Sequence, residues 1–182
     1  EPRIFSPNGD GKYDETSVVY ELSDAVDVTL VVEDLQGNPL AGESTPGAQA
    51  GSHQFLWTGL DMEGKPLPDG SYRAKVTATS LSPPFVVQSE KSTVVIDTTA
   101  PAIEIASPSD ASYHGEAVEV RGALRDPNLR TYQVTVTGGP EPYVVSTNFV
   151  SRDIEFSESL DLPDGEYALR VEATDAVENS GT

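Results

Sequence analysis

Apolar and polar residues alternate in short runs along the whole chain. After a tight turn, residues 71–79 read Ser-Tyr-Arg-Ala-Lys-Val-Thr-Ala-Thr, and residues 166–174 read Glu-Tyr-Ala-Leu-Arg-Val-Glu-Ala-Thr. A period of two places neighbouring side chains on opposite faces, so each run predicts a half-buried β-strand. No segment shows the period of an amphipathic helix. The pattern therefore predicts an all-β protein.

The predicted strands are short, and Gly, Pro, Asn or Asp residues bound each of them. One stretch, residues 41–52, is rich in Gly, Ala, Ser and Pro, and we expect it to be a flexible loop. Regularly spaced short strands favour a sandwich over an α/β fold. The predicted strands span 16–22, 26–34, 53–58, 71–79, 85–88 and 93–96, then 102–106, 116–123, 131–137, 143–146, 153–158 and 166–174.

A repeated turn divides the chain. Leu-Pro-Asp-Gly occurs at 67–70 and again at 162–165, and a tyrosine, Tyr72 or Tyr167, follows each copy two residues later. This arrangement predicts a tyrosine corner, in which the ring covers the edge of the core and its hydroxyl bonds to upstream backbone. The offset of 95 residues matches the size of one immunoglobulin-like sandwich. We therefore expect two tandem immunoglobulin/fibronectin-III-like β-sandwiches, residues 1–97 and 98–182, joined by a linker at 97–101.

The chain is strongly acidic. Thirty acidic residues against eleven basic ones give a net charge of −19, and both halves share it: residues 1–97 hold 15 acids and 6 bases, and residues 98–182 hold 15 acids and 5 bases. Such a field repels phosphate backbones and anionic lipid but attracts divalent cations. We therefore expect no nucleic-acid partner, and most of the charge serves solubility.

Cysteine is absent, which excludes disulfides, thiolate metal sites and a cysteine nucleophile. No apolar run approaches the roughly 20 residues that a membrane-spanning helix needs, so we expect no membrane insertion. The first and last residues look like cuts inside a longer polypeptide. We expect neighbouring domains of that polypeptide as the main partners, and a monomeric state.

Residues 5–14, Phe-Ser-Pro-Asn-Gly-Asp-Gly-Lys-Tyr-Asp, are the sharpest local signal for chemistry. With Ser6 at the first position of a calcium loop, Asn8, Asp10, Lys12 and Asp14 fall on the third, fifth, seventh and ninth, and Lys12 would offer its carbonyl. The match is partial, because the first position is a serine and the twelfth lacks the bidentate glutamate. The alternative is two consecutive turns in which Asn and Asp bond their own backbone. We predict a calcium site at Ser6, Asn8, Asp10, Lys12 and Asp14, with the turn interpretation open.

Catalytic patterns are missing from the sequence. His53 and His114 lie in different predicted domains, and the nucleophile elbow and phosphate-binding glycine loops are absent. The adjacent carboxylates Glu33 and Asp34 face opposite sides of a strand and cannot converge on one bond. Trp57, the only tryptophan, shares a strand face with Phe55, which predicts a core position and not a sugar-stacking platform. We expect no enzyme activity.

The first half resembles a known module. The heptapeptide at 5–11, then Asp14, then Trp57-x-Gly-x-Asp-x-x-Gly64 and the turn leading to Tyr72 are similar to the immunoglobulin-like domain of the flagellar hook-capping protein. Relatives of that domain occur in the C-terminal regions of secreted subtilisin-like proteases and in bacterial surface and gliding-motility proteins. The resemblance covers residues 5–79 and implies an accessory domain of an exported protein. A hook cap itself is not expected, because its characteristic N-terminal region is absent.

The second half resembles the tandem Ig-like repeats of large bacterial adhesins and extracellular enzymes. The likeness rests on Asp-Thr-Thr-Ala-Pro at 97–101, on Val118-x-Val-x-Gly, and on the ending at 173–179, where Glu178 stands in place of the usual glycine. In such arrays carboxylates at domain junctions bind calcium, so the resemblance makes Asp97 a candidate ligand. The alternative role for Asp97 is to bond the linker backbone.

Together these observations predict a non-catalytic tandem Ig-like module of an exported bacterial surface or secreted protein, acting as a structural spacer or accessory domain with calcium stabilisation. Two alternatives stay open. One is an adhesive module that binds glycan or a surface protein through the loops at 41–52 and 138–142. The other is the accessory region of a secreted subtilisin-like protease. We expect an extracellular or cell-surface location.

Overall fold

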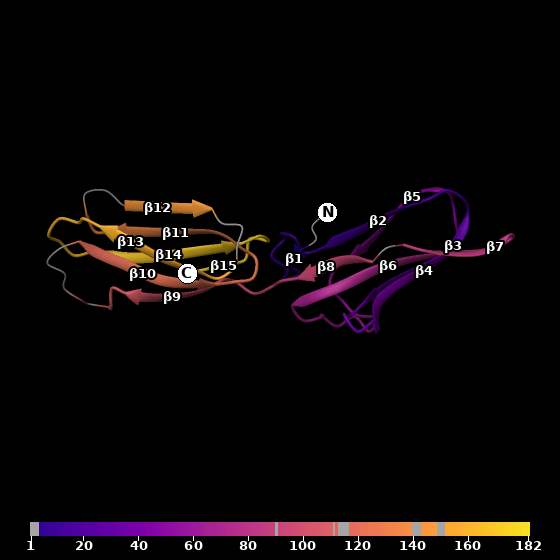
Figure 1. The fold of residues 1–182 in the computed structure, drawn as a ribbon, viewed down its shortest axis with the longest axis horizontal. Helices are drawn as coiled ribbons and strands as arrows, with labels where there is room; N and C mark the ends of the chain where they lie inside the picture. The colour runs from indigo at the N-terminus through magenta and orange to yellow at the C-terminus, as the bar shows by residue number, and fades with distance from the viewer. Residues whose placement is uncertain (1–3, 90, 111, 113–116, 140–142, 149–151) are drawn as a thin grey trace. The chain divides into compact units, whose positions relative to one another are not determined.

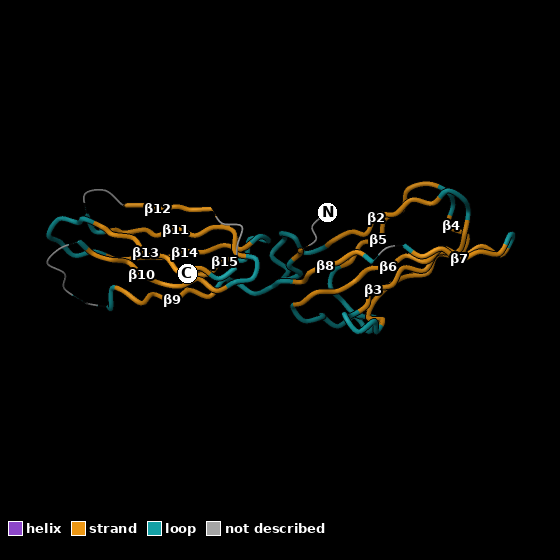
Figure 2. Tube along the Cα trace, in the orientation of Figure 1, coloured by secondary structure: helices purple, strands orange, loops and turns teal. Residues whose placement is uncertain are grey.

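The computed structural model describes residues 4–89, 91–110, 112, 117–139, 143–148 and 152–182. These residues form strands, turns and bends, and none of them forms a helix long and apolar enough to cross a membrane (Figure 2). The chain divides into two compact units, Glu1–Thr98 and Thr99–Thr182. The predicted boundary, between 97 and 98, lies one residue earlier. His114 and residues 140–142 of the predicted binding loop lie outside the described residues.

The first unit packs a large sheet against a two-stranded one (Figure 1). The large sheet has the order β1-β8-β6-β3-β4, with β7 also paired to β6, and the small sheet pairs β2 with β5. All pairings are antiparallel except β1 with β8. Its strands are β1 (Ile4–Phe5), β2 (Thr16–Leu22), β3 (Val26–Glu33), β4 (Pro39–Ala48), β5 (Gly51–Trp57), β6 (Gly70–Leu81), β7 (Pro84–Gln88) and β8 (Ser92–Ile96).

The core of the first unit follows from the alternation of its strands. Along β3 the residues Val26, Val28, Leu30 and Val32 are buried, and the residues between them face outward. Trp57 from β5 is 4% exposed and packs against Phe5 and Tyr72, with ring centroids 5.4 and 5.6 Å apart. The predicted core position of Trp57 is confirmed.

The prediction of a flexible stretch at 41–52 is wrong. Residues up to Ala48 belong to β4, which pairs with β3 from Val26 to Glu33, and Gly51 begins β5. Strand pairing uses backbone groups, so an edge strand of small residues forms although its side chains are mostly exposed. Gly42 fits this edge, because a Cβ there would lie 2.2 Å from the carbonyl oxygen of Leu30. Most of this stretch is therefore strand, and only residues 49 and 50 form the connection between β4 and β5.

The second unit also contains two sheets, ordered β13-β10-β9 and β12-β11-β14-β15. Its core combines residues of both, among them Val120 and Phe156 from one and Tyr132 and Val134 from the other. A bulge follows Arg121 in β10. The strands are β9 (Ala102–Ser107), β10 (Val118–Arg125), β11 (Leu129–Thr137), β12 (Tyr143–Asn148), β13 (Ile154–Leu160), β14 (Ala168–Asp175) and β15 (Ser180–Gly181).

Each unit contains a tyrosine corner, as the repeated turn predicts. The Tyr72 hydroxyl donates to the Pro68 carbonyl oxygen at 2.6 Å, and the Tyr167 hydroxyl donates to the Pro163 carbonyl oxygen at 3.0 Å. Tyr72 is 6% exposed. Burial and the nearby charge of Asp69 raise the pKa of Tyr72 above its ordinary value. The all-β, Ig-like sandwich architecture is confirmed.

Candidate functional site

The predicted calcium segment forms a closed loop between β1 and β2. At its base the Ser6 backbone N–H donates to the Tyr13 carbonyl oxygen at 2.8 Å. The two carboxylate oxygens of Asp14 accept the backbone N–H groups of Gly9 and Gly11 at 2.7 and 2.8 Å. The side chain of Asp14 therefore stands at the centre of the loop and holds its two glycine turns together.

Two further side chains in this loop accept backbone N–H groups. The Asn8 side-chain oxygen accepts the N–H of Asp10 at 2.9 Å, and an Asp10 carboxylate oxygen accepts the N–H of Lys12 at 2.8 Å. Gly9 and Gly11 have φ angles of 82° and 87°, a region that strains residues with a Cβ. These contacts bear out the alternative prediction of consecutive turns in which Asn and Asp bond their own backbone.

The burial of the predicted ligands and the hydrogen bonds they already make limit how calcium could bind in this loop. Ser6 is fully buried, whereas Asn8, Asp10 and Lys12 are exposed, so the predicted ligands do not lie at one depth. The carboxylate oxygens of Asp14 and one of those of Asp10 already face N–H dipoles, whose positive ends occupy the directions from which a cation binds. Calcium would have to use the remaining lone pairs or rearrange the loop, and the calcium site stays a prediction.

A second kind of carboxylate turn occurs three times in the described residues. In the turn that begins at Asp34, one carboxylate oxygen accepts the N–H groups of Gln36 and Asn38 at 2.9 and 2.8 Å, and the Asn38 amide donates to the other oxygen at 2.7 Å. These hydrogen bonds, the one from the Asn38 side chain first, hold the pKa of Asp34 below its ordinary value. The carboxylate thereby closes the connection between β3 and β4.

The turns that begin at Asp61 and Asp175 repeat this geometry. One oxygen of Asp61 accepts the N–H groups of Glu63 and Lys65 at 3.0 and 2.8 Å. One oxygen of Asp175 accepts those of Val177 and Asn179, both at 2.9 Å. In all three turns the fourth residue has a positive φ: 92° at Gly37, 77° at Gly64 and 67° at Glu178. The third turn therefore places a glutamate where the other two have glycine.

The aspartates that close these turns were not identified from the sequence. The signal was present, because Asp, two variable residues, a glycine and then Asn or Lys occur at 34–38 and at 61–65. The Asp175 turn is the buried member of the set, with Asp175 0% and Asn179 5% exposed. A carboxylate oxygen of Asp126 lies within 4.8 Å of one of Asp175. Asp126 also accepts a backbone N–H, from Asn128 at 2.6 Å.

Asp97, the other predicted calcium candidate, is 5% exposed at the end of the first unit. Its backbone N–H donates to the Phe5 carbonyl oxygen at 3.0 Å, next to the parallel pairing of β1 with β8. This contact is a main-chain bond that extends the pairing of β1 with β8 and does not involve the linker, so both roles predicted for the Asp97 side chain, calcium ligand and partner of the linker backbone, stay predictions.

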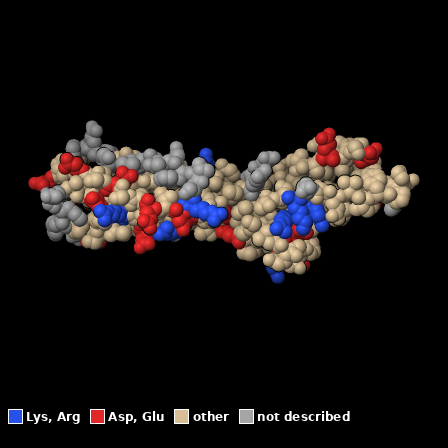
Figure 3. Space-filling view, in the orientation of Figure 1, with Lys and Arg blue, Asp and Glu red and all other residues tan. Residues whose placement is uncertain are grey.

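Three basic residues, Arg73, Lys75 and Lys91, act on the carboxylate of Glu33 and form a basic cluster on the acidic first unit (Figure 3). Glu33 points to the outer face of its sheet but is only 4% exposed. The hydrogen bond from the Lys91 ammonium, assisted by the charges of Lys75 and Arg73, holds the pKa of Glu33 below its ordinary value although burial opposes this. The cluster fastens the start of β8 to β3, which is a structural role.

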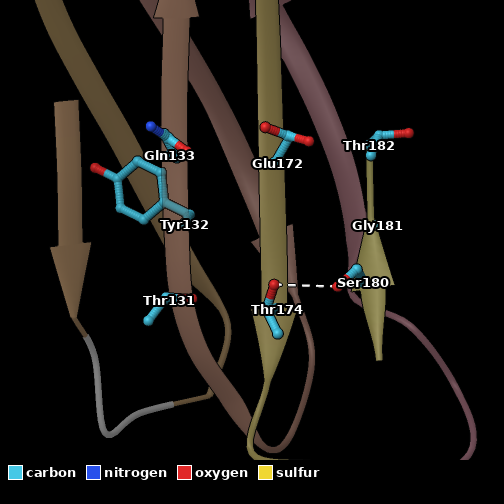
Figure 4. A pocket seen from close by; sticks show the side chains of 8 residues that line it. All are labelled: Thr131, Tyr132, Gln133, Glu172, Thr174, Ser180, Gly181 and Thr182. Atoms are coloured by element: carbon cyan, nitrogen blue, oxygen red, sulfur yellow. Dashed lines mark hydrogen bonds between the residues drawn. The ribbon is translucent and has the colours of Figure 1, made fainter. Parts of the chain in front are cut away.

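One depression on the second unit is large enough to be considered as a small-ligand site. This depression, of about 290 Å³, lies on the outer face of the second unit, lined by Gln133, Glu172, Thr174 and Ser180 among others (Figure 4). Hydroxyl groups of Thr174 and Ser180 are hydrogen-bonded across it at 3.2 Å. Ligand pockets measure about 300–1,000 Å³ and are mostly apolar, so this depression lies at the lower end of that range.

Comparison with known proteins agrees with the architecture. The family model described as the FlgD Ig-like domain matches residues 5–82. This match confirms the resemblance of the first half to the immunoglobulin-like domain of the flagellar hook-capping protein. A search of curated proteins returned no match. The likeness of the second half to adhesin repeats stays a prediction.

Proposed function

We propose that this chain is a non-catalytic structural module of a larger exported bacterial polypeptide, because residues 5–82 match the family model of the FlgD Ig-like domain. Ig-like domains of this kind are structural or accessory units. The proposed role is that of a spacer or accessory domain in a surface or secreted protein, and a secreted subtilisin-like protease is one such parent.

One observation carries this proposal: four aspartates use their carboxylates to close turns. Asp14, Asp34, Asp61 and Asp175 each accept two backbone N–H groups from their own loop. Catalysis needs titratable groups that converge on a substrate position beside a cleft. These four carboxylates lie in four separate turns, where each closes its own loop, and this supports a structural role.

The test is a module exchange in the parent polypeptide. Three forms are compared: the intact protein, a deletion of this module, and a replacement by an unrelated two-domain Ig-like segment of equal length. A spacer predicts that deletion impairs the parent's activity and that the replacement restores it. A replacement that is folded and exported but inactive would show that this module recognises a specific glycan or protein, and the spacer role would be wrong.

The exported location has its own test. Immunodetection in cell fractions of the source bacterium should find the polypeptide at the cell surface or in the culture fluid. Detection in the cytoplasm alone would contradict the proposal. The acidic composition and the absence of cysteine do not oppose export, because an oxidising compartment permits disulfides but does not require them.

Calcium stabilisation through Ser6, Asn8, Asp10, Lys12 and Asp14 is a separate proposal, supported by the oxygen-rich loop and by the net charge of −19. Calcium at 100 times its dissociation constant would stabilise the folded state by about 2.7 kcal/mol if only that state binds it. Thermal melts in calcium and in chelator measure this directly. Overlaying melts would mean that the hydrogen bonds of the loop suffice without a cation.

A further inference from the structure

The loop between β1 and β2 contains the one Asn-Gly pair of the sequence, Asn8 and Gly9. Both residues are exposed to solvent. An asparagine followed by glycine is chemically reactive, because glycine has no Cβ and its backbone nitrogen can approach the side-chain amide carbon closely. The hydrogen bonds of the folded loop therefore decide whether Asn8 reacts.

The reaction open to this pair is deamidation through a cyclic imide. The backbone nitrogen of Gly9 gives up its proton and attacks Cγ of Asn8. A bond forms between that nitrogen and Cγ, the bond from Cγ to Nδ2 breaks, and the NH₂ group leaves as ammonia with the proton from Gly9. Water then opens the imide to aspartate or isoaspartate, so the reaction consumes water and releases ammonia and needs no other reagent.

Asp14 holds the nitrogen that has to attack. The Gly9 N–H donates to Oδ1 of Asp14 at 2.7 Å, and the other oxygen of the same carboxylate accepts the Gly11 N–H at 2.8 Å. Removal of the Gly9 proton would place a negative nitrogen against a carboxylate, and a like charge at this distance disfavours ionisation. The imide nitrogen carries no hydrogen, so ring closure also breaks this hydrogen bond. Asp14 therefore opposes both steps.

The side chain that has to be attacked is restrained as well. The Asn8 side-chain oxygen accepts the backbone N–H of Asp10 at 2.9 Å, and its nitrogen lies 3.5 Å from an Asp10 carboxylate oxygen. These contacts restrict the rotation that brings Cγ of Asn8 into a planar ring with the Gly9 nitrogen. The base of the loop is closed by the hydrogen bond from the Ser6 N–H to the Tyr13 carbonyl oxygen. Both reacting groups are thus held by the folded loop.

We propose that Asn8 is a deamidation site that the folded loop keeps unreactive, with Asp14 as the restraining residue, and that it reacts when the loop opens. The product carries a new negative charge beside Asp10, where the amide of Asn8 now lies. Isoaspartate also lengthens the main chain within a loop that is closed by short hydrogen bonds. The modified loop is therefore weaker than the original one. This inference depends neither on the proposed spacer role nor on calcium.

Peptide mapping by mass spectrometry, after incubation of the full chain at mildly alkaline pH with chelator, tests the proposal. The deamidation rate at Asn8 is measured in the folded chain, in the chain unfolded in urea, and in folded Asp14→Ala and Asp14→Asn. We expect the unfolded chain to react much faster than the folded one. Both variants should raise the folded rate about tenfold or more, because a hydrogen bond to a charged acceptor is lost. Equal rates in the folded and unfolded chain, or Asp14 variants that react at the wild-type rate, would overturn the proposal.

The matched control is Asp34→Ala, with circular dichroism to confirm that each variant is folded. Asp34 is half-buried like Asp14 and also accepts two backbone N–H groups of its own turn, but these belong to Gln36 and Asn38. Its loss should therefore leave the rate at Asn8 unchanged. Asp14→Asn keeps the shape of the side chain and removes only its charge, so it serves as the test if Asp14→Ala does not fold. Equal acceleration by the Asp34 and Asp14 variants would show that general destabilisation governs the reaction, and the role of Asp14 would be wrong.

Discussion

Replacing Glu178 by glycine should stabilise the second unit. Glu178 has a φ of 67° at the fourth position of the Asp175 turn, where the two equivalent turns have Gly37 and Gly64. A left-handed conformation costs a residue with a Cβ about 1 to 2 kcal/mol. Glycine relieves that strain but loses about 0.5 to 1 kcal/mol in backbone entropy. The net gain is about 0.5 to 1 kcal/mol, which raises Tm by roughly 2 to 8 °C in a domain of this size.

The measurement is thermal and urea unfolding of the full chain, with the transition of the second unit followed separately. Two controls isolate the backbone effect. Glu178→Ala removes the same carboxylate but keeps the strained φ, so it should not reproduce the gain. Gly64→Ala should destabilise the first unit by about 1 kcal/mol, because a Cβ there meets no atom within 4 Å and only the conformation of the backbone, whose φ is 77°, is penalised. A gain equal in the alanine and glycine variants of Glu178, or no gain at all, would refute this reasoning.

Three further predictions concern single side chains. Tyr72→Phe should cost about 1 kcal/mol and more than Tyr167→Phe, whose hydrogen bond is longer and more exposed; equal losses in chemical denaturation would contradict the burial argument. Asp14→Ala, which removes two acceptor contacts, should destabilise the first unit by about 1 to 2 kcal/mol and Asp10→Ala by about half as much; the reverse order would show that Asp14 does not hold the loop. Folding lowers the pKa of Asp34, so its contribution to stability is present at neutral pH and is lost as pH falls below about 4; Asp34→Asn should flatten the acid dependence of the first unit, and an unchanged slope would exclude this carboxylate as a cause.

The fold could be predicted because its signals are local. Strand alternation and the repeated Leu-Pro-Asp-Gly turn need only a few consecutive residues, and they gave the two sandwiches and both tyrosine corners. The β4 strand was missed because its residues, small and turn-forming, have no alternation of their own. Its pairing with β3 is decided by backbone groups of a distant segment. The two-residue strands β1 and β15 are too short to produce a pattern.

The site was harder to predict, because the same residue types serve cation binding and turn closure. The spacing of Asn8, Asp10 and Asp14 fits both, and only the coordinates show that their oxygens accept backbone N–H groups. The resemblance to adhesin repeats already indicated that Glu178 stands where a glycine is usual, and the structure adds that its φ is positive, at 67°, in a turn closed by Asp175. The Asp-x-x-Gly spacing is visible in the sequence at 34–37 and 61–64. The hydrogen bonds by which one carboxylate closes each turn are visible only in the structure.

The most direct test of the central claim, two self-contained Ig-like cores, is to express residues 1–98 and 99–182 as separate polypeptides and follow their unfolding. Each core is closed by its own sheets and its own tyrosine corner. The account predicts that each fragment gives β-type circular dichroism and one cooperative transition. A fragment that is unfolded, or that melts without cooperativity at every temperature, would contradict it.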